Sequence, residues 1–500
     1  MKKIHPFFLF LIVCIFLSCQ SSEHQDALNL KGRVKRIVLD NGLKVLLLKR
    51  GEAPVFSAII QFKVGGIEEK EGETGLAHFF EHLAFKGTDK IGTSDFAKES
   101  VLIEKIDSLG TQITELKKQQ NANPSRIANL SAELDRLQAE ESALIQNNEF
   151  FDIIRRNGGD DLNAHTSKDF TVYSVSLPSN KLELWAYLES ERYKHRVFRE
   201  FFKERSVVAE ERRMDMDNTA DGRLYEAYIN EAFDKSPYKI STVGLAQDIQ
   251  NYTPAEAKSF YETYYIPERT VITLVGNFDL QAAEKIIKNN FGDIPAKPDT
   301  KLAFAGEHFD PASFPRTVTI DGPEADRFYL GYHRPAHPHP DDEVFDVISS
   351  LLCDGRTSRL YKKIVLDLKI ASNVECVSTY PAARLDSLFT IFSLPLEGHS
   401  NAEVLQVIKE ELKRLAEEGP SPQELTKVVN TLEASFIYPL DSNSSLASDL
   451  ALFESLTGGW EYMYDFQDRV RRITGDDVRR VAGQYFVPQK EVTAFFEKDL

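Results

Sequence analysis

The stretch from Gly75 to Gly87, GLAHFFEHLAFKG, leaves little choice of local structure. It contains no glycine or proline between its two ends, so we expect a helix with a glycine at each terminus. On a helix His78 and His82 share one face, and the carboxylate of Glu81 lies beside them. Two imidazoles at this spacing can bind Zn²⁺, and the carboxylate can take a proton from a water on the ion. This H-x-x-E-H spacing is the inverted zincin motif, although two chance histidines on a half-buried helix would show the same letters.

Composition places the chain among globular proteins. Hydrophobic residues make up 42% and charged residues 27% of its 500 residues, which is enough apolar material for substantial cores. A chain of this length is expected to form roughly two to four domains. The formal net charge is −17, which argues against nucleic-acid binding because no basic excess is present to neutralise phosphates.

The N-terminus is expected to be a targeting segment rather than part of the fold. Two lysines precede an apolar run at residues 7–17, which is too short to span a membrane comfortably and is typical of a secretory signal. A serine followed by Cys19 resembles a bacterial lipobox, with Phe16 where leucine is usual. Residues 1–19 would then be a lipoprotein signal peptide, and residues 20–32 a tether from the lipid-modified Cys19 to the periplasmic side of the outer membrane. The alternative is an ordinary signal peptide that is cut nearby.

The rest of the chain reads as two similar units of strands and helices. Strands are expected at residues 37–39, 43–48, 55–64, 162–166, 170–175 and 269–276 in the first unit, and at 317–320, 327–332, 372–379, 387–394 and 492–496 in the second. An internal duplication would explain this repeated order. We place the first domain at residues 33–293 and the second at 316–500, with a proline-rich linker at 294–315 between them. The second unit has no counterpart of the histidine pair.

One segment of the first unit, residues 99–147, differs in kind from its surroundings. Its apolar residues recur at alternating steps of three and four, before and after a break at residues 121–125. This heptad pattern predicts an antiparallel, coiled-coil-like helical hairpin that projects from the domain. We expect it to act as a spacer or a packing arm rather than as a specific binding element.

Two further groups of potential ligands give weaker signals. Cys353 and Cys376 could form a disulfide in an oxidising compartment, but isolated cysteines are more often single buried thiols, and we favour that interpretation. His333, His337 and His339 alternate with prolines. They could bind a metal, but the prolines make the stretch irregular, and we favour a solvated loop.

A charged helix is expected at residues 202–217. It carries Glu204 and Glu211, which are seven residues apart and share a face, whereas Glu210 lies about 100° away around the helix. Without the histidine helix upstream, we would interpret these glutamates as residues on a solvent-exposed face of the helix.

Four stretches together resemble the pitrilysin/insulinase family of inverzincin metallopeptidases, in its half-size, processing-peptidase-like branch. They are Asn41–Leu43, Gly75–Thr88, Asn163–Thr166 and Glu204–Glu211. The resemblance covers nearly all of residues 33–500 apart from the helical insert. It implies a Zn²⁺ cofactor and an α+β fold of two homologous units, each an antiparallel sheet with helices on one face.

The resemblance also implies roles for individual residues. Glu211 would be the third zinc ligand beside His78 and His82, and Glu204 would be the acid that supports them. Asn163–Ala164 would lie on an edge strand that pairs with the backbone of the substrate.

The sequence departs from the family in two places. The interval from His82 to Glu211 is longer than usual, and the insert at 99–147 accounts for it because a hairpin brings its own ends together. The family often carries an arginine and a tyrosine seven residues apart in the second unit, which bind the substrate near the scissile carbonyl. The matching positions here are Val365 and Ser372.

We therefore expect a zinc-dependent endopeptidase that hydrolyses peptides or unfolded segments inside a closed chamber, with Glu81 as general base on zinc-bound water. A non-catalytic peptide-binding or assembly subunit is the alternative, and a scaffold built on the helical hairpin is a third. Val365 and Ser372 cannot supply the missing charged and phenolic hydrogen bonds. We expect a half-size homologue without the zinc motif to supply them in a heterodimer; the alternative is a homodimer.

Overall fold

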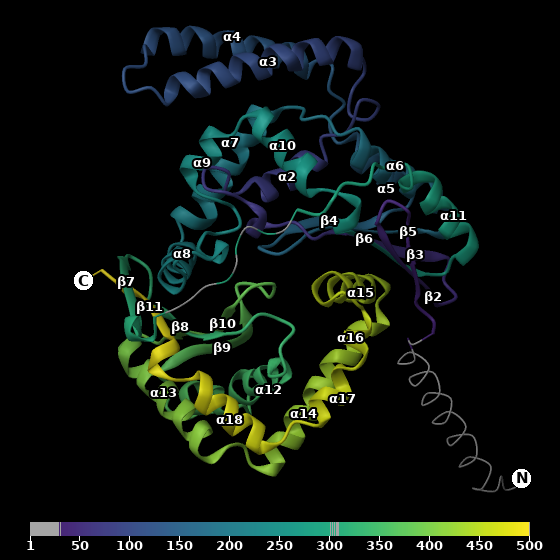
Figure 1. Cartoon of the computed structure of the whole chain (residues 1–500). Coiled ribbons are helices and arrows are strands. Elements are labelled where there is room, and N and C mark those ends of the chain that lie inside the picture. The colour runs from purple at the N-terminus through teal and green to yellow at the C-terminus, as the bar shows by residue number, and fades with distance from the viewer. Residues whose placement is uncertain are drawn as a thin grey trace, which may run out of the picture.

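The computed structural model describes residue 30, residues 32–300, residues 302, 304 and 306, and residues 310–499. The expected signal peptide, the lipidation site Cys19 and all of the tether except residues 30 and 32 lie outside this part of the chain. The described residues form two halves, each built on one β-sheet, which lie one above the other in Figure 1. No helix in the described part is both long and apolar enough to cross a membrane.

The first sheet has six strands in the order β1-β2-β6-β3-β5-β4, and the second has five in the order β7-β11-β8-β10-β9. The strands of the first sheet are β1 (Lys35–Val38), β2 (Lys44–Lys49), β3 (Val55–Phe62), β4 (Asp160–Thr166), β5 (Thr171–Pro178) and β6 (Thr270–Gly276). Those of the second sheet are β7 (Arg316–Gly322), β8 (Arg327–Arg334), β9 (Ala371–Tyr380), β10 (Ser387–Pro395) and β11 (Glu491–Lys498). When β1 is set aside, both sheets follow the same order of first, fifth, second, fourth and third strand, so the two units are topological repeats.

Both sheets are mixed. The fold class α+β is therefore confirmed, and each sheet, expected to be antiparallel, contains one parallel pair. β2 pairs with β6 in parallel and β7 pairs with β11 in parallel, whereas the other neighbours are antiparallel. Each parallel pair joins the first strand of the repeat to its last. Local patterning identifies such segments as strands but does not show which distant strand they pair with.

Helices join the strands and cover the sheets. In the first half they are α2 (Leu76–Ala84), α3 (Phe96–Lys117), α4 (Pro124–Ser142), α5 (Glu149–Arg156), α6 (Leu182–Lys194), α7 (Phe201–Arg212), α8 (Ala220–Ala232), α9 (Ala246–Asn251), α10 (Pro254–Tyr264) and α11 (Leu280–Phe291). In the second half they are α12 (Asp342–Cys353), α13 (Asn401–Glu418), α14 (Pro422–Ile437), α15 (Asn443–Thr457), α16 (Glu461–Tyr464), α17 (Phe466–Arg471) and α18 (Gly475–Tyr485). Several begin at a side-chain cap, as α14 does at Ser421, whose hydroxyl accepts the N–H of Glu424 while the Glu424 carboxylate accepts the N–H of Ser421.

Each half contributes one helix that packs on the sheet of the other half (Figure 1). We call these two helices, α8 and α15, the exchanged helices. α15 of the second half packs through Leu450 on the face of the first sheet that carries Ile59. α8 of the first half packs through Leu224 on the second sheet, in a cluster with Ala494. The other face of the first sheet carries the large core under α2, α6, α10 and α11. Every residue of β6 is consequently buried, as expected for a strand covered on both faces.

α3 and α4 form an antiparallel hairpin that extends from the upper part of the molecule in Figure 1. The hairpin contacts α7 and the segment just before it. Gly110 of α3 leaves room for the ring of Phe202, which would lie 2.3 Å from a Cβ at that position. The buried carboxylate of Glu99 accepts two hydrogen bonds from Arg199, which also donates to the carbonyl oxygen of Thr88 at 3.0 Å.

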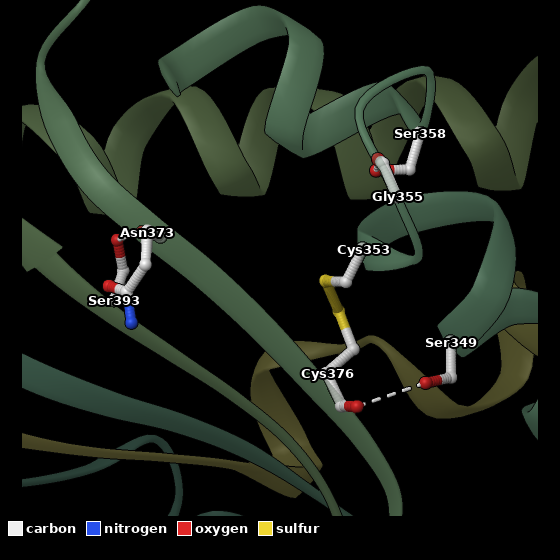
Figure 2. Close-up of a disulfide and its surroundings, with 7 residues drawn as sticks. All are labelled: Ser349, Cys353, Gly355, Ser358, Asn373, Cys376 and Ser393. Carbon is white, nitrogen blue, oxygen red and sulfur yellow. Dashed lines mark hydrogen bonds between the residues drawn. A yellow bond between two sulfur atoms is a disulfide. The ribbon is translucent and has the colours of Figure 1, made fainter.

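Cys353 and Cys376 form a disulfide, so the expectation of two single thiols is wrong (Figure 2). Cys353 is the last residue of α12 and Cys376 lies on β9, and their Cα atoms are 5.6 Å apart. Ser349, one turn earlier on α12, donates its hydroxyl to the carbonyl oxygen of Cys376 at 3.1 Å. The packing of α12 on β9 brings the two cysteines together, and their spacing along the chain gives no sign of it.

The histidines of the proline-broken stretch do not form a solvated loop throughout. His333 lies on β8 and is buried between the rings of Phe233 and Phe314, so that expectation is wrong for this residue. The strand simply continues past it to Arg334. His337 Nδ1 lies 2.7 Å from Oδ2 of Asp342.

Candidate functional site

The histidine motif lies on α2, as expected. Apolar residues of this helix are buried in the first core, while His78, Glu81 and His82 stay partly exposed on the other side. Gly75 is the N-cap residue of this helix, and its φ of 92° is in the left-handed region. A Cβ at this position would lie 2.3 Å from the carbonyl oxygen of Val243, so glycine is required both for the backbone conformation and for the close approach.

His78, His82 and Glu211 converge between α2 and α7. Nε2 of His78 lies 3.5 Å from Oε1 of Glu211, and Nε2 of His82 lies 3.2 Å from Oε2 of the same carboxylate. The centroids of the two rings are 4.9 Å apart. One ligand atom from each residue lies within 4.8 Å of the other two, as the binding of a single ion requires. Two imidazole nitrogens and one carboxylate oxygen fit Zn²⁺, and this ligand set leaves a coordination position open in catalytic sites.

Glu204 lies against the second ring nitrogen of His82. Its Oε2 is 3.6 Å from Nδ1 of His82, and its Oε1 is 2.6 Å from Nζ of Lys86. Burial lowers the pKa of His82, but hydrogen bonds to Glu204 and Glu211 outweigh it and raise the pKa to about 9. Hydrogen bonds from His78 and His82 hold the pKa of Glu211 well below its usual range. The two acids therefore stabilise positive charge at this point, as a cation site requires.

Glu81 faces β4, the strand that carries Asn163 and Ala164. Thr166, at the end of this strand, donates its hydroxyl to Oε2 of Glu81 at 2.7 Å. Asn163 is exposed, and Ala164 packs against the first core. β4 is the last strand of its sheet and pairs with β5 alone among the described strands. A free edge of this kind can add an extended peptide as a further strand.

The positions that replace the family's arginine and tyrosine lie in the second half. Val365 packs against the second core in a π-helical turn at Tyr361–Asp367. Ser372 lies on β9 and donates its hydroxyl to the carbonyl oxygen of Leu394 at 3.2 Å. Neither side chain provides a cation or a phenol.

Sequence reasoning assigned no role to Lys86 and Thr166, which contact this group, or to Glu69, which contacts the start of the helix that carries it. Lys86 follows His82 by four residues in the same motif, and Thr166 ends the motif that begins at Asn163, so both could have been singled out. Glu69 accepts the backbone N–H groups of Gly75 and Ala77 at 2.8 Å each, and so caps the N-terminus of α2. It is one of several acids in its loop, and no sequence signal distinguishes it from them.

Two family models match the chain. One is described as "Insulinase (Peptidase family M16)" and matches residues 44–113, which include the histidine motif. The other is described as "Peptidase M16 inactive domain" and matches residues 251–432, most of which belong to the second half.

Similar proteins and structures extend over almost the whole chain. Zinc protease PqqE of Helicobacter pylori is 27% identical over 470 residues, which are 92% of each chain. A zinc protease of Streptomyces coelicolor, named as uncharacterized, is 22% identical and covers 90% of this chain and 87% of its own. A solved protease structure from Helicobacter pylori gives a TM-score of 0.77 at 25% identity, over 93% of this chain and 99% of that one. The periplasmic protease PqqL from Escherichia coli gives 0.68 at 20% identity over 93% of this chain but 48% of its own, so this chain spans about half of that protein. The chain belongs to the M16 peptidase family, the insulinase/pitrilysin family, as one of its half-size members.

Proposed function

We propose that this protein is a zinc endopeptidase that cleaves peptides or unfolded segments inside a closed chamber. The observation that carries the proposal is the convergence of His78, His82 and Glu211 beside the carboxylate of Glu81. The relatives that are named zinc proteases support it. A protein that only binds peptides would not need an acid at the position of Glu81.

The residues of the site have different roles in peptide hydrolysis. Zn²⁺, when bound by His78, His82 and Glu211, supplies a Lewis acid that polarises a carbonyl group and lowers the pKa of water. Glu81 takes the proton from the attacking water and returns it to the leaving amine nitrogen. The free edge of β4 at Asn163–Ala164 aligns the peptide backbone by strand addition.

A Glu81→Gln variant tests this function, with Glu210→Gln as the matched control. Glu210 is next to Glu211 on α7, but it pairs with Arg213 at the surface. We expect Glu81→Gln to bind zinc as the unmodified protein does and to lose at least about 100-fold of its turnover of a quenched peptide. Glu210→Gln should retain both properties. Undiminished cleavage by Glu81→Gln would refute the role of Glu81.

We further propose that the working enzyme pairs this chain with a half-size homologue that lacks the zinc motif. Val365 has no donor, and the hydroxyl of Ser372 donates to the carbonyl oxygen of Leu394, so neither replaces the arginine or the tyrosine. Losing one such donor costs about 10²–10³ in rate. The partner would supply these groups and the far wall of the chamber. Size-exclusion chromatography with kinetics separates the alternatives: a homodimer with full turnover, unchanged when the homologue is added, would contradict the heterodimer.

The lack of an arginine and a tyrosine at positions 365 and 372 favours one second candidate, a non-catalytic peptide-binding or assembly subunit. This candidate predicts protein without stoichiometric zinc and without turnover, alone or with any homologue. Zinc content measured beside peptide turnover therefore separates it from the enzyme.

We place the protein on the periplasmic side of the bacterial envelope, anchored through Cys19. The signal-like N-terminus and the Cys353–Cys376 disulfide, which requires an oxidising compartment, support this location. The related PqqL is described as periplasmic. Cys19→Ser should release the folded protein from the membrane fraction, and continued membrane association of this variant would show that the anchor lies elsewhere.

A further inference from the structure

Thr166 is the one described residue whose side chain donates a hydrogen bond to Glu81. Its Oγ1 lies 2.7 Å from Oε2 of Glu81, a normal length for a hydroxyl bonded to a carboxylate. Glu81 lies on α2 and Thr166 at the end of β4, so the bond joins the helix of the metal site to the edge strand. Oε1 of Glu81 accepts no hydrogen bond from the described residues.

The hydroxyl of Thr166 is held in place by the sheet. Thr166 pairs with Thr171 of β5 at the last position of the ladder, and the following turn is closed by a bond from Ser167 N to Phe170 O at 2.8 Å. Ala164, two residues earlier, points to the same side of β4 and packs against the first core. Thr166 therefore meets Glu81 from a fixed position.

A carboxylate on a long side chain has little orientation of its own, because its terminal torsion is broad and roughly two-fold. A general base must point at the proton that it takes. We propose that Thr166 is a positioning residue: its hydroxyl holds Oε2 of Glu81 so that Oε1 takes the proton of the attacking water. This inference rests on the proposed role of Glu81.

The position of Thr166 also links the base to the bound substrate. Asn163–Ala164, where the peptide backbone is proposed to add, and Thr166 belong to the same strand. A peptide held on β4 and the carboxylate held by Thr166 are thus placed by one element.

Kinetics of Thr166→Val and Thr166→Ser test the proposal. Valine keeps the shape of threonine and removes the donor, so kcat should fall by about 10- to 100-fold while KM and zinc content stay within about twofold. Serine keeps the donor and should restore kcat to within about threefold. In a Glu81→Gln background the valine change should cost nothing further, because it acts through Glu81. Full kcat in Thr166→Val, or equal losses in the valine and serine variants, would overturn the proposal.

Crystal structures of the metal-free variants give a readout that does not depend on activity. The carboxylate of Glu81 should keep one orientation in the unmodified protein and in Thr166→Ser, and should rotate or split in Thr166→Val. An unchanged Glu81 in the valine variant would overturn the proposal. A failure of the proposed function would look different: the unmodified protein would have no turnover, while Glu81 would still move in Thr166→Val only.

Discussion

At the scale of single residues, His82 is held from two sides. Its Nε2 faces Glu211 and its Nδ1 faces Glu204, and Nζ of Lys86 lies 2.6 Å from the outer oxygen of Glu204. The side chain of Glu204 is 9% exposed, and hydrogen bonds to His82 and Lys86 outweigh its burial and lower the pKa of its carboxyl group. An acid in this position fixes the ring of a metal-binding histidine and increases its basicity.

We expect Glu204→Gln to weaken zinc binding by about 10- to 100-fold, because outer partners of this kind contribute that much to metal affinity. Competition with a chromogenic chelator measures the change. Glu200→Gln is the control, because Glu200 also pairs with Lys86, at 2.9 Å, but has no contact with His82 among the described ion pairs. Equal losses in the two variants would show that net charge, and not orientation of His82, is responsible.

A second residue-scale prediction concerns His333, whose pKa burial lowers from 6.5 to about 3. The unfolded chain binds a proton near pH 6.5 and the fold does not, so the stabilising contribution of neutral His333 is complete above pH 6.5 and is lost as pH falls towards 3. We expect this residue to reduce the free energy of unfolding by about 1.4 kcal/mol per pH unit in that window. Urea unfolding at several pH values should show a slope that is shallower by this amount in His333→Leu, whatever its absolute stability. Identical slopes would contradict the assignment.

The sequence allows parts of the site to be predicted for a simple geometric reason. A helix determines the relative positions of His78, Glu81 and His82 over a few residues, so their grouping follows from the letters alone. Glu211 is distant in the chain, and its place beside them was implied by family resemblance. The contact between Thr166 and Glu81 depends on how an edge strand packs against a helix, and local sequence patterns do not predict such packing.

At the scale of elements, the helical hairpin is part of the site's support. The pair Glu99–Arg199 is fully buried, and Arg199 also donates to the carbonyl oxygen of Thr88, just beyond the histidine motif. Phe202 and Arg205 of α7 contact Gly110 and Thr114 of α3. Because α7 also carries Glu204 and Glu211, α3 braces the helix that holds both acids.

We expect Glu99→Gln to lower the free energy of unfolding by about 3–5 kcal/mol, because it leaves the charge of Arg199 buried without its partner. Chemical denaturation measures this loss. The double variant Glu99→Leu/Arg199→Met should recover only part of the stability, because it removes the buried charge but leaves the carbonyl oxygen of Thr88 without the donor it has in Arg199. Lys98→Gln is the control, because Lys98 is 76% exposed in its pair with Asp95. This substitution should lower the free energy of unfolding by at most about 0.5 kcal/mol. An unchanged free energy of unfolding in Glu99→Gln would mean that this end of the hairpin does not brace the domain.

Heptad spacing predicted the two helices of the hairpin, since both of their apolar stripes face each other locally. The same reasoning did not identify the exchanged helices α8 and α15. Their apolar residues pack on the sheet of the opposite half, far away in the chain. A local pattern shows that such a helix has a buried face but not what covers it.

At the scale of the whole molecule, the exchanged helices join the two halves into one body. Further contacts link them directly: Arg384 of the second half donates to the buried carboxylate of Glu68 at 2.9 Å, and Asp169 accepts the backbone N–H groups of Ala383 and Arg384. The halves are therefore topological repeats without being independent of each other.

This interlocking predicts that a cut between the halves leaves them associated. A specific protease site introduced between residues 300 and 310, and cleaved in the folded protein, should give two fragments that elute together in size-exclusion chromatography. Residues 33–300 expressed alone should aggregate, because the face of the first sheet that α15 covers is then exposed. Separate elution of stable, monomeric fragments would show that the two halves are not interlocked.

An anomalous difference map at the zinc edge, measured from crystals of the unmodified protein, tests directly whether His78, His82 and Glu211 bind zinc. We expect one strong peak between Nε2 of His78, Nε2 of His82 and the carboxylate of Glu211, at about 2.0–2.2 Å from each ligand atom. A map without a peak at this position, or with its strongest peak elsewhere, would contradict the assignment of this group as the metal centre of a peptidase.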